Sequence, residues 1–107
     1  MTRYVWPEDV FVHKPAFLIT IDTEGDNLWQ KHDSITTENA RYLPRFQQLC
    51  EKYGFKPVWL TNYEMAIDPV YIEFAKDTIA RGTAEIGMHL HAWNSPPTDP
   101  LTDDDWR

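Results

Sequence analysis

The chain of 107 residues contains a single cysteine, no long apolar segment and no internal repeat. One cysteine excludes an internal disulfide, and because Cys50 lies on the apolar face of a predicted helix, we expect its thiol to be buried and to carry no chemistry. A membrane-spanning helix needs about 20 apolar residues, and a signal peptide needs an uninterrupted apolar core. The sequence shows neither, so we expect no membrane insertion and a cytoplasmic location.

Positive charge is also scarce, with 10 Lys and Arg against 17 Asp and Glu, a formal net charge of −7. Nucleic acids and anionic membranes are bound through clustered Lys and Arg. The composition therefore argues against both as partners and favours an uncharged or cationic substrate, or a metal ion. Part of the acidity is concentrated near the end of the sequence, in Asp99, Asp103, Asp104 and Asp105. We expect these residues to lie in a solvated loop or at the start of a helix.

The apolar residues, 42% of the chain, are arranged as alternating strands and helices and suffice for the core of one domain. Pro44 and Gly54 bound the first predicted helix, and an Asp68 cap and Gly82 bound the second. Strands are predicted at 16–21, 57–60 and 84–89, and helices at 44–53 and 69–81, with a further short strand considered at 10–12. This order predicts an α/β fold with a parallel three-stranded sheet and right-handed crossovers.

Each predicted helix carries an apolar face with the i, i+3, i+4, i+7 spacing of a buried stripe. The face of the first helix consists of Phe46, Leu49, Cys50 and Tyr53, and that of the second of Tyr71, Phe74, Ala75, Thr78 and Ile79. We expect both faces to be buried. A three-stranded parallel sheet has two open edges and few helices to cover it, so we expect residues 16–107, after a lead-in at 1–15, to form the N-terminal part of a larger barrel or open sheet.

Polar side chains follow each predicted strand, and ligands of parallel α/β folds gather at the carboxyl ends of strands. Any one of these groups alone is typically a cap, a turn former or a satisfied polar residue. Together they bring carboxylates near His89 and His91, which alternation along a strand places on one face. The set is Asp22, Glu24, Asp26, Thr61, Asn62, Glu64, His89 and His91. Imidazole and carboxylate ligands predict a divalent metal site, with zinc expected and cobalt or nickel as alternatives.

Three stretches resemble the NodB-like polysaccharide deacetylases, carbohydrate esterase family 4. Asp22-Thr23-Glu24-Gly25 after an apolar strand resembles the first motif of the family, usually written T-F-D-D-G. Residues 44–58 are similar to the helix and following strand of the family, and residues 85–89 match the approach to its second motif, H-S/T-x-x-H. The resemblance covers residues 16–97 and implies the N-terminal part of a distorted (β/α) barrel.

The resemblance also implies residue roles. Asp22 matches the general base and His89 the first metal-binding histidine. The second Asp of the first motif, a metal ligand in the family, falls at Thr23 in this chain. Glu24 or Asp26 would have to replace it as a metal ligand. The second metal-binding histidine falls at Trp93, and His91 is the available substitute. The residues predicted to contact substrate are Asp26, Asn62, Tyr63 and Trp93, with Trp29 also placed to stack on a sugar ring.

The activity implied by the resemblance is metal-dependent hydrolysis of an N-acyl group on a sugar or polysaccharide precursor, in surface-glycan biosynthesis. The later motifs of the family lie beyond Arg107, so we expect the chain alone to be inactive. Two alternatives stay open at this point. One is hydrolysis of another C–N bond, as in the allantoinase-like relatives, and the other is a non-catalytic glycan-binding or scaffold domain, motivated by Thr23 and Trp93 standing where ligands are expected.

Overall fold

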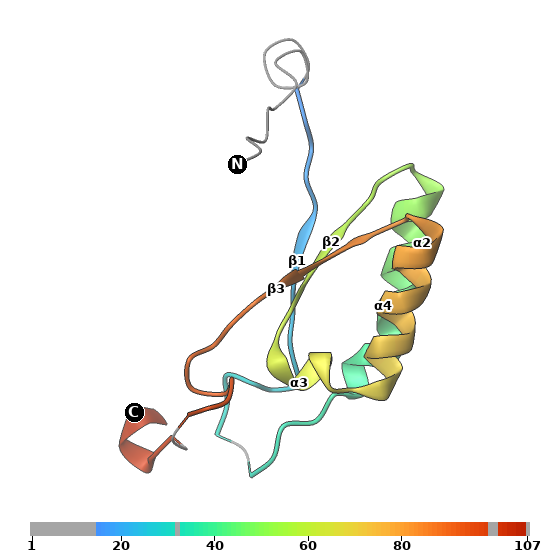
Figure 1. Ribbon diagram of the computed structural model, residues 1–107. Helices are drawn as coiled ribbons and strands as arrows, with labels where there is room; N and C mark the ends of the chain where they lie inside the picture. Colours follow the sequence, from blue (N-terminus) through green and yellow to red (C-terminus); the bar gives the residue numbers. More distant parts are fainter. Residues whose placement is uncertain (1–14, 32, 99–100, 107) are drawn as a thin grey trace, which may run out of the picture.

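The computed structural model describes residues 15–31, 33–98 and 101–106 (Figure 1). In this part of the chain, the strands β1 (Thr20–Thr23), β2 (Val58–Thr61) and β3 (Glu85–Met88) form one parallel sheet in the order β1-β2-β3. The predicted α/β class and parallel three-stranded sheet are therefore confirmed. The strand considered at 10–12 and the acidic residue Asp99 lie outside the described residues.

The first strand begins later than predicted, at Thr20 instead of Ala16, and continues to Thr23. Its first ladder bond runs from the Val58 N–H to the Ile19 carbonyl. Pro57, one residue earlier, directs its carbonyl to the other neighbour, β3, where it accepts from the Glu85 N–H. Residues 15–18 are not part of the sheet, and the side chains of Phe17 and Leu18 are exposed. The prediction of a strand covered on both faces was wrong for this segment.

Helices α2 (Leu43–Lys52) and α4 (Pro69–Arg81) connect the strands, close to the predicted ranges. The Asp68 side chain accepts a hydrogen bond from the Tyr71 N–H at the start of α4, and Gly82 ends this helix with a φ of 67°. Thr36 and Thr37 are candidate caps for a helical piece before Pro44, and the short 3₁₀ helix η1 (Glu38–Tyr42) does follow Thr37, although the Thr37 side chain makes no capping hydrogen bond. The short helix α3 (Tyr63–Ala66) was not predicted, whereas a helix start was one expectation for the acidic residues of η2 (Asp103–Trp106).

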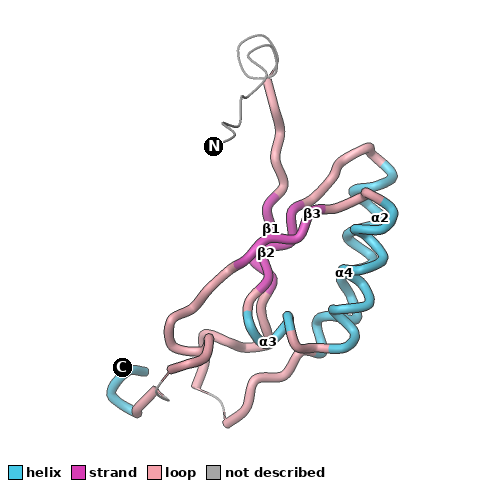
Figure 2. Tube along the Cα trace, viewed as in Figure 1, coloured by secondary structure: helices cyan, strands magenta, loops and turns pink. Residues whose placement is uncertain are grey.

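Both long helices lie against the same face of the sheet (Figures 1 and 2). The indole ring of Trp59, in the central strand, packs edge-on against Phe46 of α2 at 6.1 Å and Phe74 of α4 at 5.3 Å. Its N–H donates to the Gln47 side chain of α2 at 3.0 Å. By register, Ile21 and Ile86 share this face with Trp59. Among the described residues, the opposite face, which carries Asp22, Leu60 and Gly87, has no helix over it.

The predicted buried faces of the helices are only partly confirmed. Cys50 is buried, and burial raises the pKa of its thiol, which agrees with an unreactive core position. Tyr71, Ala75 and Thr78 of α4 are also buried, whereas Ile79 is exposed. Three residues of the predicted apolar face are 40–64% exposed, contrary to prediction: Phe46 and Leu49 of α2, and Tyr53, the residue that follows its last turn. They line a groove beside β1, an edge strand, so no further strand is present in the described sheet for them to pack against.

Candidate metal centre

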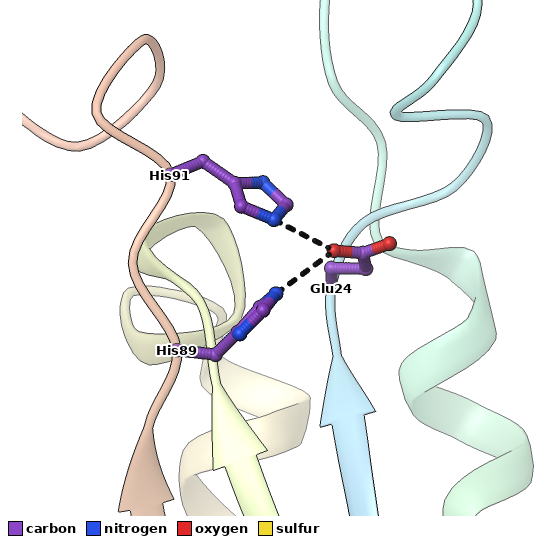
Figure 3. A group of neighbouring side chains, drawn as sticks. All are labelled: Glu24, His89 and His91. Atoms are coloured by element: carbon purple, nitrogen blue, oxygen red, sulfur yellow. Dashed lines mark ion pairs between the residues drawn. The ribbon is translucent and has the colours of Figure 1, made fainter.

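Three side chains from the segments that follow the two outer strands meet at the carboxyl end of the sheet (Figure 3). The Oε2 atom of Glu24 lies 3.6 Å from Nε2 of His89 and 3.4 Å from Nε2 of His91. One ligand atom from each residue lies within 4.8 Å of the others. Glu24 Oε2 is buried and has no hydrogen-bond partner among the described residues. A buried carboxylate oxygen without a donor, facing two imidazole nitrogens, is a position that suits a cation.

Strand alternation explains why these residues meet. Glu24 follows Asp22 by two residues, and His89 follows Gly87 by two, so both continue the face of the sheet that is not covered by α2 or α4. The His89 N–H donates to the Thr61 carbonyl, which extends the pairing of β3 with β2 by one bond. Thr23 points the other way: it is buried, and its hydroxyl donates to the Ile21 carbonyl. Thr23 therefore does not contribute to the cluster.

Asp22, predicted as the general base, lies on the other side of the His89 ring. Its Oδ1 atom is 3.8 Å from His89 Nδ1, and its side chain is 62% exposed. It stands next to the cluster without being one of its three members. This carboxylate is thus accessible to water and adjacent to a candidate ligand.

Two tryptophans border the cluster. The indole N–H of Trp29 donates to Oε1 of Glu24 at 2.9 Å, and its ring lies edge-on to His91 at 5.1 Å. Trp93 stacks on His91, with centroids 4.7 Å apart and planes 20° apart. Trp93, the position at which the resemblance would put a second metal-binding histidine, instead supports the ring of His91. Trp29 remains largely exposed and presents an aromatic surface at the site.

Glu64, in α3, joins the loops that follow all three strands. Its Oε1 atom accepts from the Gly25 N–H at 2.6 Å, and its Oε2 atom accepts from the Asn94 amide at 2.9 Å. The carboxylate is almost fully buried. The sequence places Glu64 among the polar residues after the second strand but gives no indication of this bridging role, because its partners lie 39 and 30 residues away.

Asn62 is fully buried and uses both ends of its amide inside the protein. Its Oδ1 atom accepts from the Tyr63 N–H at 2.7 Å and caps α3, and its Nδ2 atom lies 2.9 Å from His91 Nδ1. No part of this side chain is exposed to a substrate, so the predicted substrate contact has no support in its position. Tyr63, by contrast, is partly exposed at the start of α3.

Asp26 is engaged in holding its own loop. Its Oδ2 atom accepts from the Thr36 hydroxyl and the Glu38 N–H, and its Oδ1 atom accepts from the Asn39 N–H. The Asn39 side chain in turn donates to the Glu24 carbonyl at 2.7 Å. Of the two carboxylates considered as replacements for the missing ligand, Glu24 joins the histidines, whereas Asp26 orders the loop around it.

Comparison of the chain with protein-family models, curated proteins and solved structures finds no match. Among the described residues, no helix has both the length and the apolar character that crossing a membrane requires. The functional argument therefore depends on the chemistry of the cluster itself.

Proposed function

We propose that Glu24, His89 and His91 form the metal centre of a hydrolase that removes an N-acyl group from a sugar or polysaccharide precursor. The observation that carries the proposal is the buried Glu24 Oε2 atom, which lacks a hydrogen-bond donor and faces the Nε2 atoms of both histidines. One carboxylate and two imidazoles make a ligand set that suits zinc, with cobalt and nickel as alternatives, and that leaves a coordination position open.

A divalent cation held by these three residues would polarise an amide carbonyl and lower the pKa of water. The chain's own groups account for further requirements of the reaction. The exposed carboxylate of Asp22 is available to accept a proton from water. The exposed ring of Trp29, next to the stacked pair of His91 and Trp93, offers an aromatic surface for a sugar ring. Tyr63, the first residue of α3, is a second exposed aromatic residue.

The sheet supports the proposal that this chain is the N-terminal part of a (β/α) barrel of NodB type. Consecutive strands are neighbours, and both connecting helices lie on one face. In a barrel of this kind the helices form an outer ring, and the active site lies at the carboxyl ends of the strands. The candidate metal centre occupies that end, on residues that continue the uncovered face.

Metal binding tests the proposal directly. We expect about one zinc ion per chain after dialysis, with binding lost in both Glu24→Gln and His89→Ala because each removes a ligand. Glu73→Gln, which neutralises an exposed carboxylate on α4, serves as the control for charge and is expected to bind like the unaltered protein. Zinc binding that survives in His89→Ala would rule out the proposed centre.

The hydrolytic step needs a protein in which this chain is joined to the remaining strands of the proposed barrel. There, Asp22→Ala is expected to abolish acetate release from N-acetylated sugars while leaving the metal bound. Undiminished acetate release would remove Asp22 from the role of general base. Release that is insensitive to a chelator would contradict the metal-dependent reaction.

A non-catalytic glycan-binding domain is the second candidate. The observation that favours it is the contact between the Asn62 amide nitrogen and His91 Nδ1, which does not match the usual surroundings of a metal-binding histidine. This candidate predicts sugar binding through Trp29 that is unchanged by a chelator, whereas the metal-dependent hydrolase predicts weaker binding of an acetamido sugar after metal removal.

A further inference from the structure

The orientation of the Asn62 amide is fixed by its two partners. The Tyr63 N–H can only donate, so the atom 2.7 Å from it must be the amide oxygen. The amide nitrogen then faces His91 Nδ1 at 2.9 Å. Rotating the amide by half a turn would place its NH₂ group against the Tyr63 N–H, two donors facing each other, and would remove the cap of α3.

This orientation determines which nitrogen of His91 carries the proton. Because the amide nitrogen donates, Nδ1 must accept, and the neutral ring carries its proton on Nε2. Nε2 is the atom that faces Glu24 Oε2 at 3.4 Å. A protonated Nε2 has no lone pair for a metal ion. His91 in this form cannot bind a cation beside Glu24, and its Nε2–H completes no hydrogen bond to Glu24 Oε2 in the structure.

His89 is surrounded differently. Its Nδ1 atom faces the Asp22 carboxylate at 3.8 Å, and its Nε2 atom faces Glu24 at 3.6 Å. A carboxylate facing the ring nitrogen opposite the candidate ligand atom is the usual partner of a metal-binding histidine. The two histidines of the cluster thus differ in the group behind the ring: a carboxylate for His89 and an amide nitrogen for His91.

We propose that Asn62 is a positioning residue that sets the proton position of His91 and thereby weakens metal binding at the cluster. The inference rests on the proposed metal centre. For His91 to bind a metal through Nε2, its proton must move to Nδ1, and the Asn62 amide must rotate to accept it. The ring keeps the same number of protons in this change. The rotation sacrifices the hydrogen bond that caps α3, and metal binding must offset that loss.

A carboxylate at position 62 would remove this conflict. In Asn62→Asp both side-chain oxygens accept, one from the Tyr63 N–H and the other from Nδ1–H of His91. Aspartate caps helices about as well as asparagine, so the cap of α3 is retained. Since a partner behind a metal-binding histidine typically changes metal affinity by about 10–100-fold, we expect zinc affinity to rise by roughly that factor.

Two further variants separate the alternatives. Asn27→Asp adds the same charge to the exposed loop that carries Glu24, at a residue whose φ of 52° suits asparagine and aspartate equally. It controls for a general attraction of cations and is expected to change zinc affinity by less than about threefold. Asn62→Ser can cap α3 but cannot reach His91 with a donor of the same length, so we expect an affinity between those of the unaltered protein and Asn62→Asp.

The experiment combines zinc titration of the 107-residue chain against a chromophoric chelator with ¹H–¹⁵N spectra of the histidine rings in the metal-free state. We expect His91 to carry its proton on Nε2 in the unaltered protein and on Nδ1 in Asn62→Asp, with the tighter zinc binding in the latter. A proton already on Nδ1 in the unaltered protein, or equal affinities in Asn62→Asp and Asn27→Asp, would overturn the role of Asn62 and leave the metal centre in place. No zinc in either the unaltered chain or Asn62→Asp, when both are folded, would remove the metal centre and this inference together.

Discussion

The contact between Glu64 and Asn94 offers a test of whether the three strand-end loops are held together by one carboxylate. Asn94→Asp places a second carboxylate against Glu64 Oε2, where the amide nitrogen now lies at 2.9 Å. Two like charges about 4 Å apart repel by about 4 kcal/mol at an effective dielectric constant of about 20. Because the loop can relax and one group can take up a proton, we expect a loss of roughly 2–3 kcal/mol in the free energy of unfolding at neutral pH.

Glu64→Gln alone should be milder. The glutamine oxygen can still accept from the Gly25 N–H, and its NH₂ group can donate to the Asn94 oxygen, which is buried and lacks a partner among the described residues. We expect a loss of about 1 kcal/mol, from the weaker hydrogen bonds of a neutral group. In the double variant the new amide at position 64 donates to the new carboxylate at position 94, so adding Asn94→Asp to Glu64→Gln should cause little further loss.

The assay is urea unfolding of the unaltered protein, both single variants and the double variant, analysed as a double-mutant cycle. We expect a coupling of about 2 kcal/mol in favour of the double variant, decreasing at acid pH as the carboxylate pair of Asn94→Asp takes up a proton. If Asn94→Asp has the same effect in the Glu64→Gln background as in the unaltered protein, to within about 0.5 kcal/mol, the two side chains are not paired in solution and the bridging role of Glu64 is refuted.

Two further predictions concern the surroundings of the site. The Thr37 hydroxyl and then the Tyr71 N–H hold the pKa of Asp68 below its ordinary value, so its stabilisation is complete above a pH of about 4 and is lost as the pH falls through the folded-state pKa. Asp68→Ala should therefore lower the free energy of unfolding by about 1 kcal/mol at neutral pH and by less in acid, as measured by urea titration at several pH values. A gap between the variant and the unaltered protein that widens in acid would contradict the role of these hydrogen bonds. A Cβ on Gly25 would lie 2.4 Å from Ile35 Cγ2. Gly25→Ala should therefore lower the free energy of unfolding by about 1–3 kcal/mol and weaken zinc binding, because it displaces the loop that carries Glu24. Unchanged urea and zinc titrations would show that the loop accommodates the methyl group.

Much of the fold follows from local patterns in the sequence. The Asp68-Pro69 start and the Gly82 end of α4 were predicted from residues that act within one turn of the helix, and the structure has them there. The choice of His89, His91 and Glu24 as neighbours followed from strand alternation and from the common end of parallel strands. Both kinds of inference depend on geometry that a short segment largely determines by itself.

The differences arise where partners are distant along the chain. The start of β1 depends on where β2 begins, and the exposure of Leu49 depends on β1 lying at an edge of the sheet. The contact between Asn62 and His91 spans 29 residues and joins two loops whose separation no local pattern specifies. Composition and periodicity identify which residues are available for a site, but not which of them contact the second ring nitrogen of a candidate ligand histidine.

The register of β1 against β2 links the candidate site to the core. Ile21 is paired with Trp59 and faces the helices, whereas Asp22 is paired with Leu60 and faces away from them. A slip of one residue would turn Asp22 and Glu24 toward the apolar rings between sheet and helices, where an unpaired carboxylate costs several kcal/mol. The same two carboxylates that are proposed to serve the reaction therefore also select one strand alignment, so their replacement by apolar residues would relax the specification of the fold as well as remove the site.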